Sequence, residues 1–287
     1  MLTQIFKENM KHKLPFIALL LGLFAISCDE IPPEIPPFQP PSGDQKIILE
    51  EFSGVQCPNC PQGSAQIENL KALYGDRFIA LTMHAFVTGG LSAPHSDSRF
   101  DFRLDAAEEI IKFIGLPQGI PAASINRIDF VEDGIMLLPN QWAAKVGEVL
   151  NRDAPVGLSL VPSFDSLSRE LTIEVTVLGQ TLVNGDLRFH MGLSEDNIID
   201  KQTDGSRIIE EYNHKHILRA YITNNLGDNI ASVLNPNQRW TRTYTYTIPE
   251  AQGWWKVKDM HVFAFVSNIT DGAKEVIQAE EVSLIQN

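Results

Sequence analysis

Two patterns of hydrophobic and polar positions divide the chain. From residue 46 to about 153, short apolar runs typical of strands alternate with segments whose apolar residues recur at helical spacing. Strands are predicted at 46–52, 78–84 and 119–125. Helices are predicted at 62–74, 105–114 and 141–150. This alternation indicates an α/β domain at 45–153 with a mainly parallel sheet.

Beyond residue 154 the apolar positions recur at every second residue. Clear examples are 157–161, 171–177, 241–247 and 261–266. Many short alternating segments separated by turn residues predict an immunoglobulin-like antiparallel β-sandwich at 154–287. Residues 208–218 fit either a strand or a short helix at the sheet edge. The predicted fold class is therefore α/β plus all-β.

The N-terminal segment follows neither pattern. Three lysines precede an apolar run at 14–26, which is too short to span a bilayer and ends in Ala25-Ile26-Ser27-Cys28. This resembles the lipobox of bacterial lipoproteins, although Ala25 stands where leucine is usual. The resemblance implies a signal peptide at 1–27 and a lipid anchor on Cys28, by which the protein attaches to a membrane. An ordinary secretory signal is the alternative.

A proline-rich segment follows. Six prolines among the sixteen residues 29–44 prevent both helix and central strand. We expect a semi-rigid tether at 28–44 that could hold the first domain about 50 Å from the bilayer. The acidic residues Asp29 and Glu30 are similar to export signals of surface-exposed lipoproteins. They favour surface display over a periplasmic position.

The net charge limits the partners. The formal charge is −13, and removal of three lysines and one glutamate with residues 1–27 leaves −15. Nucleic acid is therefore excluded as an expected partner. A polybasic surface for anionic lipid is also missing, which leaves acylation as the expected membrane attachment.

The motif Cys57-Pro58-Asn59-Cys60 lies where the first strand ends and a helix begins. A disulfide across two intervening residues closes a very small loop, so it would stabilise little and suits exchange chemistry better. A turn staple is one alternative, and half of a zinc site is another that lacks a second cysteine pair. With Cys28 lipidated, Cys57 and Cys60 are the only possible pair, in an exported protein where disulfides persist.

The order of strand, Cys-x-x-Cys, helix, second strand and a later Ile-Pro resembles the thioredoxin fold over residues 45–153. The resemblance implies that Cys57 attacks as a thiolate at the helix N-terminus and that Cys60 resolves the mixed disulfide. It also implies that Pro121 is a cis-proline facing the pair and that Ile120 pairs with bound peptide. A trans-proline that merely starts a strand is the alternative.

The same resemblance singles out two further side chains. Glu51, six residues before Cys57, matches the buried carboxylate that accepts protons, although strand alternation could instead turn Glu50 inward. His84 ends the second strand at the edge where the pair lies and could stabilise a thiolate as a cation. A packed or solvent-facing histidine is the alternative. Gln56 replaces the tryptophan usual before the first cysteine, which leaves substrate and potential open.

Metal and cofactor signals are weak. His214 and His216 lie two apart without a nearby third ligand, and Asp196, Asp200 and Asp204 lack the spacing of a calcium loop. We expect no metal and no cofactor.

Taken together, the chain is similar to the 28-kDa outer-membrane-protein family of the Bacteroidota. Further motifs that carry this resemblance are Cys-Pro-Asn-Cys-Pro at 57–61, Ile-Asn-Arg at 125–127 and Val-Ile-Gln-Ala at 276–279. It implies an outer-membrane lipoprotein but no reaction. We expect thiol–disulfide exchange or redox sensing in the cell envelope, acting on proteins or peptides that present thiols or disulfides. The alternative is a non-catalytic binding, adhesion or envelope-assembly protein with a structural disulfide, so whether the protein is an enzyme stays open.

Overall fold

The most apolar runs of the chain form the centre of one mixed sheet. The computed structural model describes residues 43–250 and 253–285, so Cys28 and most of the proline tether lie outside the described residues. Strands β1 (Ile47–Phe52) and β2 (Phe78–Met83) are fully buried and pair in parallel. Strand β3 (Ala122–Ile125) pairs antiparallel with the other edge of β1.

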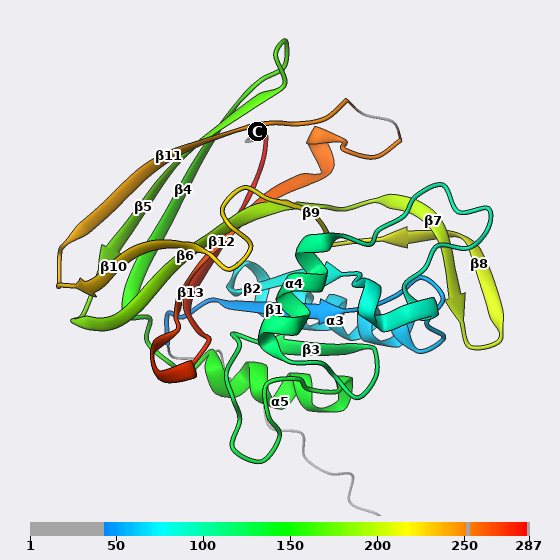
Figure 1. Ribbon diagram of the computed structural model, residues 1–287, viewed down its shortest axis with the longest axis horizontal. Coiled ribbons are helices and arrows are strands. Elements are labelled where there is room, and N and C mark those ends of the chain that lie inside the picture. The colour runs from blue at the N-terminus through cyan, green and yellow to red at the C-terminus, as the bar shows by residue number, and fades with distance from the viewer. Residues whose placement is uncertain (1–42, 251–252, 286–287) are drawn as a thin grey trace, which may run out of the picture. The chain divides into compact units, whose positions relative to one another are not determined.

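Helices cover both faces of these strands because alternate side chains of β1 point in opposite directions. Ile47 and Leu49 pack with helices α3 (Cys60–Tyr74) and α5 (Pro139–Val149). Ile48 packs on the opposite face with α4 (Asp105–Ile114). Figure 1 shows α3 and α4 on opposite sides of the sheet. The short 3₁₀ segments η1 (Gly75–Arg77) and η2 (Phe86–Leu91) flank β2.

The sheet continues into the second half of the chain. Its order is β13-β12-β6-β9-β2-β1-β3, and β10 also pairs with β6. The added strands are β6 (Val183–Glu195), β9 (Ile217–Tyr221), β10 (Asp228–Leu234), β12 (Met260–Asn268) and β13 (Glu275–Ser283). Only β1–β2 and β2–β9 are parallel in this sheet. The expected mainly parallel sheet is therefore wrong, because β3 runs antiparallel to β1 and strands of the antiparallel half extend the sheet.

A second layer completes the β-rich half. Strands β4 (Val156–Asp165), β5 (Glu170–Gly179) and β11 (Arg239–Thr247) form a three-stranded antiparallel sheet. Its inward residues, such as Ile173 and Val175, share a core with Phe189 and Val262 of the long sheet. The predicted fold class is confirmed, with one layer of the sandwich continuous with the thioredoxin-like sheet. The division into two domains at residue 153 stays a prediction.

A two-stranded hairpin stands apart from both sheets. It consists of β7 (Ile198–Asp204) and β8 (Arg207–His214) and connects β6 to β9 (Figure 1). The segment 208–218, which fitted a strand or a helix, therefore forms parts of the two strands β8 and β9. Short 3₁₀ segments, η3 (Val257–Asp259) and η4 (Thr270–Gly272), lie near the C-terminal end. Within the described ranges, no helix is both long and apolar enough to cross a bilayer.

The Ile-Asn-Arg motif ties the first strand to the last. The Asn126 N–H donates to the Ile48 carbonyl at 3.0 Å, and Asn126 Oδ1 accepts from the Ile48 N–H at 2.8 Å. The Asn126 carbonyl accepts from the Val276 N–H at 2.8 Å. Two of the motifs that carry the family resemblance therefore contact each other directly.

Arg127 makes an ion pair that is fully buried. Its Nη2 and Nε donate to the two oxygens of Glu50 at 2.6 and 2.7 Å, and both side chains are 0% exposed. The guanidinium also lies 4.8 Å from the ring centre of Phe265 in β12. Bidentate geometry and a ring face supply the partners that a buried charge requires.

Removal of this arginine should strongly destabilise the fold. Arg127→Met leaves the Glu50 carboxylate buried without its partner, which should lower the free energy of unfolding by about 3–5 kcal/mol. Urea unfolding at neutral pH measures the change. The double variant Glu50→Gln, Arg127→Met should recover part of the loss because no buried charge remains. A loss below about 1 kcal/mol in the single variant would contradict the role of the pair.

Candidate functional site

The cysteine pair lies at the N-terminus of α3, directly after the end of β1. Cys57 and Cys60 form a disulfide, and each is only 1% exposed. Cys57 Sγ lies 3.6 Å from the carbonyl oxygen of Ile120. The Ile120–Pro121 peptide bond is cis, as the sequence predicted. The structure thus places the cis-proline segment beside the cysteine pair, whereas pairing of Ile120 with a peptide stays a prediction.

Gly63 allows a close approach that the sequence reading missed. It lies in α3 one turn after the pair, and a Cβ at this position would stand 3.0 Å from Glu51 Oε1 and 3.0 Å from Pro121 Cβ. The absence of a side chain lets α3 pack directly on the carboxyl group and the proline ring. A glycine inside an otherwise helical pattern was the available signal.

Glu51 is buried beside the pair, on the face of β1 that carries Ile47 and Leu49. Burial raises the pKa of its carboxyl group to about 7, although a hydrogen bond from Thr82 and the charge of His216 act in the opposite direction. Thr82 Oγ1 donates to Glu51 Oε2 at 2.9 Å, whereas Oε1 has no hydrogen-bond partner among the described residues. A carboxyl group with a pKa near 7 can take and return a proton at neutral pH.

The competing glutamate faces the other way. Glu50 is equally buried, but it occupies the α4 face and is bound by Arg127. Of the two alternatives, the structure therefore favours Glu51 as the carboxyl group beside the cysteines. A proton-transfer role for it stays a prediction.

His84 does not have the charge that was expected of it. Burial lowers the pKa of its imidazole to about 3, with a further lowering by His214, so the ring is neutral at physiological pH. The ring packs against Phe102 at a centroid distance of 5.4 Å. This agrees with the packed-histidine alternative and argues against thiolate stabilisation by a His84 cation, because the charge of Asp101 raises the pKa by less than burial lowers it.

The β7–β8 hairpin covers the turn that carries the cysteines. The Thr203 N–H donates to the Val55 carbonyl at 2.8 Å, and the Gly205 N–H donates to the Pro58 carbonyl at 2.9 Å. Gln202 Nε2 donates to the Cys57 carbonyl at 3.2 Å. These contacts span almost 150 residues of sequence, and they help to explain why both cysteines are buried. No pattern in the sequence predicted that the hairpin covers the turn with the cysteines.

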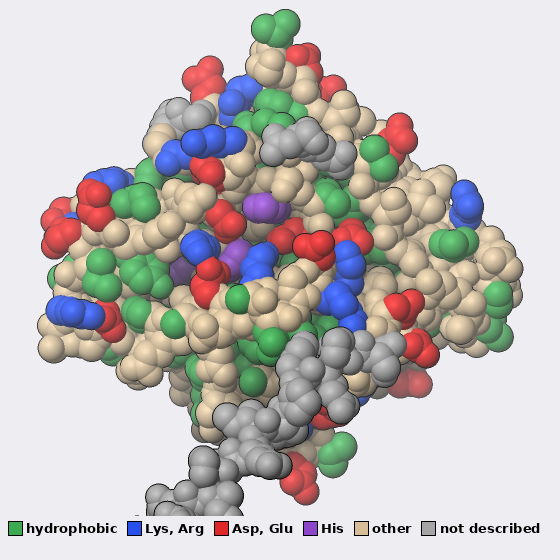
Figure 2. Space-filling model, turned by 180° about the vertical axis from the view of Figure 1, so that it is seen from behind, with side chains coloured by type: hydrophobic (Ala, Val, Ile, Leu, Met, Phe, Trp, Pro, Cys, Tyr) green, Lys and Arg blue, Asp and Glu red, His purple; other side chains and the backbone are tan. Residues whose placement is uncertain are grey.

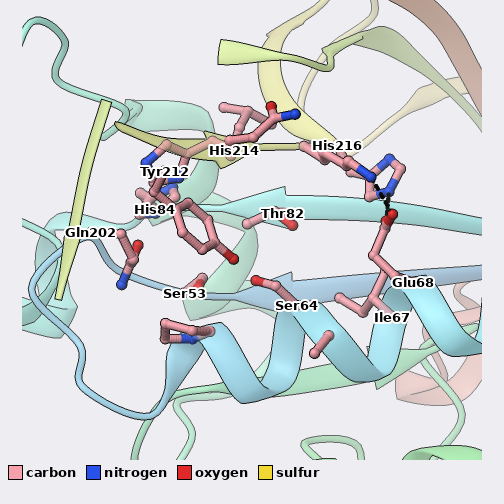
Figure 3. A pocket seen from close by; sticks show the side chains of 15 residues that line it. Ser53, Ser64, Ile67, Glu68, Thr82, His84, Gln202, Tyr212, His214 and His216 are labelled. Carbon is pink, nitrogen blue, oxygen red and sulfur yellow. Dashed lines mark hydrogen bonds and ion pairs between the residues drawn. The ribbon is translucent and has the colours of Figure 1, made fainter. Parts of the chain in front are cut away.

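A cavity of about 360 Å³ lies between the hairpin, β2 and α3, beside the cysteine pair. Figure 3 shows Tyr212 of β8 with its hydroxyl group toward Ser64 of α3, and Gln202 and Thr82 on the surrounding wall. Thr82 is also the residue that bonds Glu51. The buried carboxyl group is therefore separated from this cavity by one side chain.

An ionic cluster closes one end of the cavity. His216 Nε2 lies 2.9 Å from Glu68 Oε1, and His216 Nδ1 lies 3.2 Å from Asp196 Oδ1. Burial alone would lower the pKa of His216, but these two carboxylates outweigh it and raise the pKa above its ordinary value. The hydrogen bond to His216 likewise holds the pKa of Glu68 at about 2. The cluster thus fastens α3 to the segment between β8 and β9.

The charged groups are mixed in sign elsewhere as well. Figure 2 shows acidic, basic and histidine side chains gathered together near the middle of one face, so the net negative charge is not a single acidic patch there. Within residues 43–250 and 253–285, no three histidine, cysteine or acidic side chains are placed to hold a metal ion. His214 packs against Phe102 instead.

A family model named "Outer membrane protein Omp28" matches residues 108–287. The chain belongs to the Omp28 family of outer membrane proteins. The matched region includes the cis-proline, the Ile-Asn-Arg motif and the whole β-rich half. It begins after the cysteine pair, so membership of the Omp28 family carries no information about the disulfide. The comparison with curated proteins found no match.

Solved structures share the fold. HBP35 of Porphyromonas gingivalis is 17% identical, with a TM-score of 0.64 over 85% of this chain and 76% of its own. Protein AGR_C_4864 from Agrobacterium tumefaciens is 11% identical, with a TM-score of 0.50 over 86% of this chain and 98% of its own. At these identities the likeness shows the fold alone. The combination of a thioredoxin-like part and a β-rich part therefore also occurs outside this chain.

The raised pKa of Glu51 should make stability depend on pH. The unfolded carboxyl group ionises near 4.5 and the folded one near 7, so its contribution is fully present below about pH 4.5 and is lost as the pH rises through 7. Glu51→Gln, which cannot ionise, should gain on the wild type by up to about 3 kcal/mol across this interval. Urea unfolding of both proteins between pH 4 and 8 measures the difference. Parallel stability curves would show that Glu51 has an ordinary pKa.

Proposed function

We propose that this Omp28-family protein carries out thiol–disulfide exchange, or senses redox state by the same chemistry, in the cell envelope. The observation that carries the proposal is the convergence of the Cys57–Cys60 disulfide, Pro121 and Glu51, all of which pack at the first turns of α3. A structural staple needs no carboxyl group behind it with a pKa of about 7. An exchange site does, because thiols must lose protons to react.

The chemistry follows from the placement of these groups. To oxidise a partner dithiol, one partner thiolate attacks Cys57 Sγ, forms a mixed disulfide and displaces Cys60, which leaves as a thiolate and takes a proton from Glu51. The second partner thiolate then attacks the partner sulfur of the mixed disulfide, closes the partner's disulfide and displaces Cys57 as a thiolate. To reduce a partner disulfide, the Cys57 thiolate attacks it and displaces one partner thiolate, after which Glu51 removes the proton from Cys60 and the Cys60 thiolate attacks Cys57 Sγ and displaces the second. Each direction moves two electrons between two dithiol–disulfide couples, with Glu51 exchanging the proton of Cys60.

The attachment to the membrane is a further part of the proposal. The Omp28 family is one of outer membrane proteins, and the lipobox ending in Cys28 and the proline tether support a lipid anchor. Acylation of Cys28 would hold the site at the outer membrane, with the acidic Asp29-Glu30 pair favouring the cell surface. The partners would be envelope proteins or peptides that present a thiol or a disulfide.

Trapping tests the exchange. Without its resolving thiol, a Cys60→Ser variant should accumulate mixed disulfides through Cys57 when it is incubated with oxidised cell-envelope extract. Non-reducing electrophoresis should show bands that disappear with dithiothreitol, and the double variant Cys57→Ser, Cys60→Ser should show none. The absence of bands, together with no reduction of insulin and no isomerisation of scrambled substrate by the wild type, would contradict exchange.

A second candidate is favoured by one observation, the 1% exposure of both cysteines. A disulfide buried to this degree also suits a binding, adhesion or envelope-assembly protein in which the bond only shapes the loop. In that case a pull-down from envelope extract should recover the same partners with the wild type and with the double cysteine variant. Exchange instead demands that partners retained through a mixed disulfide are lost when Cys57 is replaced.

A further inference from the structure

Gln202 reaches from β7 into the turn that carries Cys57. Its Nε2 lies 3.2 Å from the Gly54 carbonyl, 3.2 Å from the Cys57 carbonyl and 3.0 Å from the carbonyl of its neighbour Thr203. The side chain is only 4% exposed. A buried amide group shared between carbonyls of two segments fastens those segments together.

The backbone contacts of the hairpin fall on the same turn. Thr203 and Gly205 donate to the carbonyls of Val55 and Pro58, which lie on either side of the Cys57 carbonyl that Gln202 binds. Between Gly54 and Pro58, the hairpin therefore binds most of the backbone acceptors. The disulfide between Cys57 and Cys60 also constrains the shape of this turn.

We propose that Gln202 is a positioning residue of the redox site, which fastens the β7–β8 hairpin over Cys57 and thereby controls how fast a thiol reaches the disulfide. The proposal rests on the exchange function proposed above and adds a gate, the β7–β8 hairpin, that controls access to the disulfide. Gln202 does not contact the exchange partner, and no covalent bond of its own forms or breaks during exchange. It acts through the backbone of the cysteine turn.

Burial makes such a gate necessary. Exchange needs a thiolate to approach Cys57 Sγ directly, and a sulfur in a side chain that is 1% exposed offers no such approach. The hairpin is fastened at the turn itself and forms a separate two-stranded sheet, so its departure uncovers the pair without breaking a strand pairing of the long sheet. The long sheet and its core need not change.

Reduction should loosen the same contacts. When the disulfide opens, two bonded sulfurs move apart to van der Waals contact, and a close-packed interior leaves little room for this. A thiolate on Cys57 would also be costly under a closed cover. Because coupling between two equilibria is reciprocal, a closed cover that packs better on the oxidised pair disfavours reduction, and reduction weakens the closed cover by the same free energy.

The kinetic test uses reduction of the whole protein by dithiothreitol. One thiolate of the reagent attacks Cys57 and displaces Cys60, and the second closes the oxidised ring and displaces Cys57, so two electrons and two protons reach the cysteines. Gln202→Met keeps the shape but loses the donors, and it should be reduced about three- to tenfold faster than the wild type. Glu210→Gln, which removes only the surface ion pair between Glu210 and Lys201 in the same hairpin, is the matched control and should react at the wild-type rate.

A second substitution separates positioning from a general loss of packing. Gln202→Glu places carboxylate oxygens against backbone carbonyls, so near pH 8 it should accelerate reduction more than Gln202→Met does. Towards pH 5 its acceleration relative to the wild type at the same pH should shrink, because the protonated carboxyl group regains a donor. A pH-independent ratio would mean that the hydrogen bonds of Gln202 do not hold the gate.

The wild type alone supplies the decisive comparison. Amide hydrogen exchange at Thr203 and Gly205 should be faster in the reduced protein than in the oxidised one, while amides of β12 should exchange equally in both. Equal protection of the hairpin in the two states, or reduction of Gln202→Met at the wild-type rate, would overturn the proposal. Neither measurement involves an envelope partner, so failure of the Cys60→Ser trap would count against exchange and leave the gate to be judged separately.

Discussion

A single parallel pairing at Thr82 joins the two halves of the sheet, and the site beside it depends on that pairing. The Thr82 N–H donates to the His216 carbonyl at 2.7 Å, which links β2 of the thioredoxin-like part to β9 of the β-rich part. The hydroxyl group of the same residue donates to Glu51. One threonine therefore takes part both in the junction between the two halves and in holding one oxygen of the buried carboxyl group.

The position of the β7–β8 hairpin follows from this junction. β8 ends just before His216, so the place where β9 joins the sheet determines where the β7–β8 hairpin can lie. The ion pairs of His216 with Glu68 and Asp196 then hold that connection against α3. The result is a thioredoxin-like site whose cysteines are closed over by a segment from the other half of the chain. In this protein the second half therefore covers the cysteine pair as well as extending the long sheet.

Local patterns predicted the elements well and their long-range arrangement poorly. The strand at 46–52 and the helix at 105–114 were predicted from apolar spacing, the cis bond before Pro121 was implied by the resemblance to the thioredoxin fold, and the structure contains all three. The face taken by Glu51 was undecided because two adjacent glutamates alternate on one strand. Both faces of β1 are buried, and each glutamate has a different partner. Glu50 pairs with Arg127, and Glu51 accepts a hydrogen bond from Thr82.

The missed features all involve partners that are distant in sequence. The parallel expectation for the sheet was wrong because the direction of β3 against β1, and the addition of β6 and β12, are decided by tertiary contacts and not by the period of any one strand. The charge expected on His84 was lost to burial among aromatic rings that lie in other segments. Gln202 gave no signal at all, since a single polar residue in a strand is ordinarily solvent-facing. Its contacts with Gly54 and Cys57 exist only once the fold is complete.

The central claim is that the Cys57–Cys60 bond is an exchange disulfide and not a staple. The reduction potential of this pair in the whole protein, measured by equilibration with glutathione or dithiothreitol buffers, tests the claim most directly. A potential between about −270 and −120 mV, the range of thiol–disulfide oxidoreductases, is the result that the account predicts. A potential below about −300 mV, typical of structural disulfides in secreted proteins, would contradict it.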